Sequence, residues 1–104
     1  MNTTAYAFHG LELVYVFGSY AAIDLGPFEY KPNATDLEMQ AIVQAAWTTF
    51  AYGGDPSADG LVWPVYDEAS DPYALLDVPP GTGAGVRTEQ CDYWDTLFEL
   101  LWGG

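Results

Sequence analysis

The sequence predicts a protein of the α/β class with two main amphipathic helices and a short strand or hairpin, in one domain over residues 1–104. Apolar residues recur at helical spacing over residues 35–51 and again over 88–102, which predicts the two helices. Between them, an apolar run at 73–78 is followed by prolines and glycines, as at the end of a strand. With 104 residues, 50% of them hydrophobic, the chain has apolar material for one core at most.

The N-terminal part is predicted to be mostly loop. Residues 5–30 contain His9 in a loop, followed by apolar irregular structure or a short helix around residues 11–17. Gly26-Pro27 and Lys31-Pro32-Asn33 then indicate loop structure, because glycine and proline interrupt regular elements.

The first main helix has a clear start and end. Thr35 is predicted to be its N-cap, with Glu38 as the capping-box partner. Gly53-Gly54 and Pro56 end it. Its predicted buried stripe consists of Leu37, Ala41, Ile42, Ala45, Ala46, Phe50 and Ala51, with Trp47 alongside.

Residues 55–72 are predicted to form a long loop, rich in Asp, Pro, Gly and Ser. Trp63 precedes Pro64 and is therefore expected to be extended. We expect it to pin the loop to the core; a ligand-stacking role is the alternative. A short strand is then predicted over 73–78, a turn over 79–85 and a returning strand from 86–87. The glycine run lacks the Gly-Lys-Ser/Thr ending of a phosphate loop.

The second main helix is predicted to start near Thr88 and to end at Gly103-Gly104. One face carries Cys91, Trp94, Leu97, Phe98, Leu101 and Trp102. Cys91 is expected to be a small buried residue on this face. A single cysteine excludes an intrachain disulfide, and one cysteine with one histidine cannot form a four-ligand zinc site.

The charge balance excludes several functions. Fifteen acidic residues face only Lys31 and Arg87, so the formal net charge is −13. Such a surface repels nucleic acid and anionic membranes. The acids lack the spacing of a calcium-binding loop, so we expect a solvated acidic surface with no metal and no cofactor. There is no apolar run long enough for a membrane span and no signal peptide, and the compartment stays open.

His9 is the candidate catalytic residue. It is the only histidine, and histidine is the side chain that takes and returns a proton near neutral pH. It is followed by Gly10, which permits a tight turn. The alternative is a structural histidine with its hydrogen bonds satisfied, which is the more common role of a lone histidine in apolar surroundings.

Four runs, in this order and at this spacing, are typical of one family. They are His9-Gly10-Leu11-Glu12, then Trp47-Thr48-Thr49-Phe50-Ala51 with Gly54-Asp55-Pro56, then Trp63-Pro64-Val65-Tyr66, then Arg87-Thr88-Glu89-Gln90-Cys91-Asp92-Tyr93-Trp94. Together they resemble the C-terminal segment of a type-B carboxylesterase, the group of α/β-hydrolases that includes the cholinesterases. The resemblance covers residues 7–101 and implies the C-terminal portion of an α/β-hydrolase fold, without most of its central sheet.

The resemblance implies that His9 is the general base of a Ser-His-Glu/Asp triad, with Gly10 and Glu12 supporting it. Glu12 is expected to hydrogen bond near the site or to lie on the surface; as the triad acid it is the less favoured choice. Phe8, Tyr15 and Phe17 are expected to pack in the core rather than line a substrate pocket.

The other parts of an esterase site are missing from these 104 residues. There is no Gly-x-Ser-x-Gly nucleophile elbow, and the triad acid and oxyanion hole belong to upstream parts of the family sequence. We therefore expect the histidine-bearing part of a serine carboxylesterase that is inactive alone. The alternative is a non-catalytic, acidic interaction or dimerisation module. If the chain exists alone, its apolar helix faces must be buried against each other, against a second copy or against a partner that holds the rest of the fold. A homodimer or a complementing chain is therefore one expectation.

Overall fold

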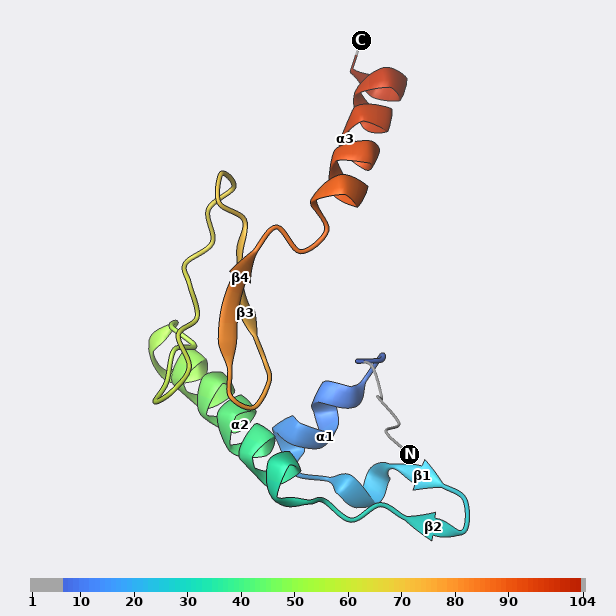
Figure 1. Ribbon diagram of the computed structural model, residues 1–104, viewed down its shortest axis with the longest axis vertical. Helices are drawn as coiled ribbons and strands as arrows, with labels where there is room; N and C mark the ends of the chain where they lie inside the picture. The colour runs from blue at the N-terminus through green and yellow to red at the C-terminus, as the bar shows by residue number, and fades with distance from the viewer. Residues whose placement is uncertain (1–6, 104) are drawn as a thin grey trace.

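The computed structural model describes residues 7–103, excluding the side chains of Asp24 and Leu25. The first two residues of the predicted N-terminal loop lie outside the described residues. The elements, in chain order, are α1 (Leu11–Phe17), the 3-10 turn η1 (Tyr20–Ala22), β1 (Asp24–Leu25), β2 (Phe28–Glu29), α2 (Ala34–Gly53), β3 (Pro72–Leu75), β4 (Gly81–Ala84) and α3 (Thr88–Trp102). Figure 1 shows an elongated arrangement, with α1, β1 and β2 near one end and α3 at the other.

α2 is the longest element, and its start corrects the predicted cap. Asn33, not Thr35, is the N-cap: its side chain accepts a hydrogen bond from the Asp36 N–H at 2.9 Å. The Asp36 carboxylate accepts the Asn33 N–H at 2.9 Å, so Asp36 replaces Glu38 in the capping box. Asparagine caps as well as threonine does, and Asp36 gains further donors in this register, as described below. At the other end Gly54 has φ +78° and ends the helix as expected.

Of the two alternatives for residues 11–17, irregular structure or a short helix, the structure shows the helix α1, which packs against α2. The Gln44 side-chain amide donates to the Val16 carbonyl at 3.1 Å. Gly18 ends α1 at φ +63°, and a Cβ there would lie 2.9 Å from the Gln40 Nε2 atom. Only glycine meets both conditions without strain, so the chain can turn beside α2.

Two hairpins supply the strands within residues 7–103. β1 and β2 form an antiparallel pair of two-residue strands that the sequence did not predict. β3 pairs antiparallel with β4, from Pro72 opposite Ala84 to Leu75 opposite Gly81. The predicted turn over 79–85 is thus wrong in part, because its second half is a strand. The strand predicted from 86–87 is also wrong. β4 can lie against β3 because Gly83 has no side chain; a Cβ there would collide with the Tyr73 ring.

The predicted extent of α3 is confirmed, but its apolar face is not buried. No α3 residue is buried, and Trp94, Phe98, Leu101 and Trp102 are each more than half exposed. Cys91 is exposed, so the expectation of a buried cysteine is wrong. The stripe predicted on α2 is wrong in part: Ala46 is buried, but Leu37 and Phe50 are 53% and 59% exposed.

Too few elements pack together to bury these faces. The buried hydrophobic residues among those described are Tyr20, Val43, Ala46 and Leu61. The radius of gyration is 17.6 Å, against about 13 Å for a compact domain of this length. The accessible surface is 8551 Å², against about 5,800 Å² for a compact chain of this mass. None of the helices within 7–103 has the length and apolarity needed to cross a membrane.

Replacing Gly18 with alanine is expected to lower the free energy of unfolding by about 1–3 kcal/mol, because the new Cβ meets Gln40 at a left-handed backbone position. Gly53→Ala is the matched control: it lies in α2, with nothing within 4 Å of its built Cβ and no positive φ. Urea unfolding followed by far-UV circular dichroism measures both. Equal midpoints for the two variants would contradict the prediction.

Candidate functional site

His9 lies in a turn immediately before α1. The turn is closed by the Leu11 N–H, which donates to the Phe8 carbonyl at 3.2 Å. The His9 side chain is exposed, and no hydrogen bond or ion pair reaches its imidazole from the rest of residues 7–103. In Figure 1 the N-terminal end of α1 points away from α2. His9 is therefore carried at the free end of a docked helix, and its ring is open to a partner or substrate.

The two predicted supporting residues lie on either side of the helix start. Gly10 is the N-cap of α1 with φ +86°, so glycine is what allows this turn without strain. Glu12 is exposed in the first turn of α1 and makes no hydrogen bond to His9. Glu12 was expected either to hydrogen bond near the site or to lie on the surface, and the structure places it on the surface.

None of the three serines is hydrogen bonded to His9. The Ser57 hydroxyl accepts the Trp63 N–H at 3.0 Å and donates to the Trp63 carbonyl at 3.3 Å. The Ser70 hydroxyl hydrogen bonds with the Asp67 carboxylate. Ser19 lies exposed after α1. Within the described part of the chain, no hydroxyl is placed for deprotonation by His9.

The structure reveals a cluster around Asp36 that the sequence analysis missed. Asp36 is 9% exposed, and its Oδ1 accepts the Tyr15 hydroxyl at 3.2 Å. Oδ2 accepts the Tyr30 hydroxyl at 2.7 Å, in addition to the Asn33 N–H. The Tyr20 hydroxyl donates to the Asp36 backbone carbonyl at 3.1 Å. These tyrosines come from α1, η1 and the segment before α2, so their spacing gave no local signal.

The tyrosine rings of this cluster also contact one another. Tyr15 and Tyr20 meet edge to face with centroids 6.1 Å apart, and Tyr20 and Tyr30 are stacked at 6.2 Å. Such contacts add about 0.5–1.5 kcal/mol each beyond the area they bury. The cluster therefore joins apolar packing to hydrogen bonding at one point.

The cluster keeps Asp36 ionised. Burial of the carboxyl acts to raise its pKa, but hydrogen bonds from the Asn33 N–H, Tyr30 and Tyr15 outweigh burial and lower the pKa of Asp36. The hydrogen bond to Asp36, with burial, raises the pKa of Tyr30 to about 12. Burial, then the Asp36 charge, raises the pKa of Tyr15 and of Tyr20. At neutral pH a carboxylate thus accepts hydrogen bonds from neutral phenols.

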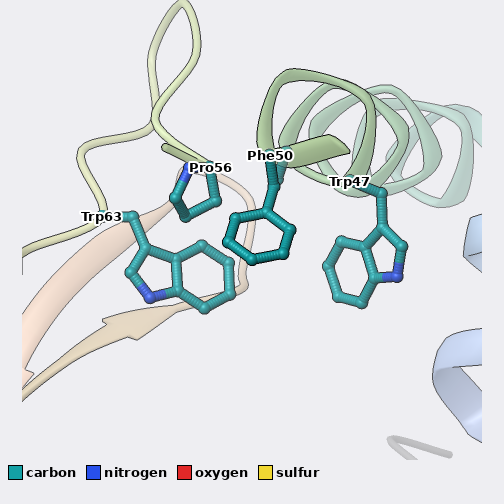
Figure 2. Close-up of a pocket in the computed structure, with 5 residues that line it drawn as sticks. Trp47, Phe50, Pro56 and Trp63 are labelled. Atoms are coloured by element: carbon teal, nitrogen blue, oxygen red, sulfur yellow. The ribbon is translucent and has the colours of Figure 1, made fainter. Parts of the chain in front are cut away.

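An apolar cavity of about 350 Å³ lies beside α2. It is lined by Ala46, Trp47, Phe50, Pro56 and Trp63. The residues that line it are far from His9 in the sequence. Figure 2 shows the Trp47, Phe50 and Trp63 rings turned toward a common space. Trp63 is half-buried, and its ring centroid lies 6.5 Å from that of Trp47, so the loop is in contact with α2 at this point.

The expectation of core packing was wrong for two of the three aromatic residues near His9. Phe8 is 60% and Phe17 is 72% exposed. Tyr15 is half-buried and directs its hydroxyl to Asp36. Within residues 7–103, no three His, Cys, Asp or Glu side chains converge as a metal site would require.

Comparison with known proteins identifies the family of this chain. The model of the carboxylesterase family matches residues 2–94. The chain belongs to the carboxylesterase family. It is 34% identical over 98 residues to the acetylcholinesterase of Gallus gallus, covering 89% of this chain and 12% of the relative. It is 37% identical over 73 residues to the para-nitrobenzyl esterase of Bacillus subtilis (strain 168), covering 68% of this chain and 14% of the relative.

A solved structure of a PNB esterase shows the same arrangement. It superposes on this chain with a TM-score of 0.73 at 29% identity, over 83% of this chain and 18% of the other. The described elements are therefore part of an α/β-hydrolase fold. This chain spans about an eighth of the length of the acetylcholinesterase and about a seventh of that of the para-nitrobenzyl esterase.

Asp36→Asn is expected to lower the free energy of unfolding by about 1–3 kcal/mol at pH 7, because a neutral amide replaces a buried, hydrogen-bonded carboxylate. Because the folded pKa of Asp36 is lowered, its stabilisation is present above its ordinary pKa and is lost as the pH falls through the folded value. The difference between wild type and variant should therefore shrink below about pH 4. Urea unfolding from pH 2.5 to 7 measures it.

The matched control is Asp59→Asn, which changes an exposed carboxyl and should alter stability by less than about 0.5 kcal/mol. A difference between wild type and Asp36→Asn that is the same at pH 2.5 and pH 7 would show that the charge on Asp36 is irrelevant.

Proposed function

We propose that this chain supplies His9 as the general base of a serine carboxylesterase, as the C-terminal, histidine-bearing part of that fold. The observation that carries the proposal is an exposed imidazole without an internal partner, at the free end of α1, in a chain of the carboxylesterase family. A histidine held this way is available to a hydroxyl from another part of the fold.

The chemistry follows from the properties of imidazole. His9 takes the proton of the attacking serine as its oxygen adds to the ester carbonyl, and then gives that proton to the leaving alcohol. Gly10, with its positive φ, allows the turn that carries His9 immediately before α1. Glu12, exposed in the first turn of α1, is proposed to support the site.

The chain alone is proposed to be inactive. Its 104 residues contain no Gly-x-Ser-x-Gly elbow, and Ser57 and Ser70 already hydrogen bond elsewhere. A general base without a nucleophile in reach contributes little to ester cleavage. The triad acid and the oxyanion hole are likewise proposed to come from other parts of the fold.

The test compares His9→Ala with wild type in two settings. As an isolated chain, both should hydrolyse p-nitrophenyl esters at the same background rate. In a chimera in which this chain replaces the corresponding segment of the Bacillus para-nitrobenzyl esterase, His9→Ala should lower kcat by at least about a hundredfold, the usual contribution of a general base.

Tyr52→Phe is the matched control in the chimera, because Tyr52 is 97% exposed on α2. An active chimera that keeps its kcat in the His9→Ala variant would refute the assigned role. His9-dependent turnover by the isolated chain would refute the proposed inactivity.

A second candidate function, a non-catalytic interaction module, is favoured by one observation. The apolar face of α3 is uncovered: Trp94, Phe98, Leu101 and Trp102 are 59% to 69% exposed. Burying one such side chain is worth about 1.5–3 kcal/mol. A second copy of this chain that packs on this face would form a dimer, whereas a complementing chain that carries the rest of the fold would give a heteromeric enzyme.

If a second copy covers α3, association should increase with salt, because each chain has a formal net charge of −13 and salt screens the repulsion. Phe98→Asp should weaken the dimer at least about tenfold, by placing a charge in the apolar contact. Thr96→Asp adds the same charge at a position outside the predicted apolar face. Sedimentation equilibrium at 0.05 M and 0.5 M NaCl measures this; a monomer at both salt concentrations would exclude the homodimer.

A further inference from the structure

Asp36 accepts more hydrogen bonds than the cap of α2 requires. The capping box is complete with the exchange between Asn33 and Asp36. The hydroxyls of Tyr15 and Tyr30 add two further donors to the same carboxylate, from α1 and from the segment before α2. A carboxylate that is 9% exposed and joins three segments does more than end a helix.

α1 depends on such ties. It has seven residues and buries none of them, and its N-cap Gly10 provides no side-chain hydrogen bond. Isolated helices shorter than about 12–15 residues are marginal in water, so packing must hold α1 in place. Within the described residues, two hydrogen bonds join α1 to α2. The Tyr15 hydroxyl donates to the Asp36 carboxylate, and the Gln44 side-chain amide donates to the Val16 carbonyl.

Both ties lie in the C-terminal half of α1, and His9 lies beyond the other end. The turn of His9 is continuous with the helix, since the Leu11 and Leu13 N–H groups donate to the carbonyls of Phe8 and Gly10. Tyr15 is about 6 Å along the axis from the first residue of α1, at the usual helical rise. A change in the angle of α1 about its ties therefore swings the turn with it.

We propose that Asp36 is a positioning residue for His9: it holds α1 against α2 through the Tyr15 hydroxyl, and α1 fixes the direction in which the turn presents the imidazole. The inference rests on the proposed role of His9 as a general base. Asp36 touches neither His9 nor substrate; its action is transmitted through one short helix.

The charge of Asp36 suits this task. An ionised acceptor strengthens the hydrogen bond that it receives from a hydroxyl; the Tyr30 hydroxyl lies 2.7 Å and the Tyr15 hydroxyl 3.2 Å from the Asp36 carboxylate oxygens. The groups that donate to the carboxylate are the phenols of Tyr15 on α1 and Tyr30 before α2, together with the Asn33 N–H. The Tyr20 hydroxyl on η1 donates to the backbone carbonyl of Asp36. The tie therefore needs no cation, in a chain that has only Lys31 and Arg87.

The test uses the full chain and needs no activity. In the Tyr15→Phe variant, which removes one oxygen and keeps the ring that contacts Tyr20, the amides of Leu13 and Ser19 should exchange with solvent about tenfold faster. The amides of α2 should stay within twofold of wild type. The heteronuclear NOE of the His9 amide should fall, showing a less ordered turn.

Two further variants sharpen the result. Tyr52→Phe makes the same chemical change at a 97% exposed position and should leave both readouts as in wild type. Asp36→Asn keeps one acceptor oxygen, so its effect on α1 should lie between those of wild type and Asp36→Ala. Because Tyr15→Phe removes only a hydroxyl, it remains informative if Asp36→Ala unfolds the chain.

Two outcomes overturn the inference. If Tyr15→Phe leaves exchange in α1 within twofold of wild type and the His9 NOE unchanged, Asp36 does not position His9. If exchange in α1 and α2 rises equally, Asp36 only stabilises the whole fold. Neither outcome depends on whether His9 is the general base, which the His9→Ala chimera decides separately.

Discussion

The hydrogen bonds accepted by Asp36 are the interaction on which the N-terminal half of this structure depends. They fix the start of α2, bring the phenol of Tyr15 from α1 onto α2, and bring in Tyr30 from the segment that leads into α2. The Tyr20 hydroxyl donates a further hydrogen bond to the backbone carbonyl of Asp36. Few apolar residues are buried nearby, so polar contacts hold these segments together, as a hydrophobic core does in a compact domain.

The exposed apolar faces have a common cause. α2 and α3 each present side chains suited to burial, but within residues 7–103 only α1 packs extensively against α2, and no element packs in this way against α3. The chain corresponds to 18% of the PNB esterase structure on which it superposes, so most of the elements that pack together in that fold lie outside the match. A segment can keep the backbone of its family, with a TM-score of 0.73, while its side chains lack their neighbours.

The sequence predicted features that depend on neighbouring residues and did not predict those that depend on residues far away in the chain. Local signals predicted α1, the end of α2 at Gly54 and the whole of α3, because helix periodicity and glycine caps depend on nearby residues. The burial of Leu37, Phe50 and Cys91 was predicted wrongly, since burial depends on elements that periodicity does not reveal. β4 was missed because its glycines indicate a turn, and only the position of the Tyr73 ring explains why glycine suits a strand there.

The candidate site divides in the same way. His9, Gly10 and Glu12 are adjacent in the sequence, so a short motif sufficed to find them. Asp36 is far from His9 in the sequence and acts through Tyr15, 21 residues away. The structure also bears on the two roles considered for His9. A structural histidine is held by hydrogen bonds or by packing, and this ring is exposed without a partner in the described chain. An exposed imidazole with no partner among the described residues is what the proposed role as a general base requires.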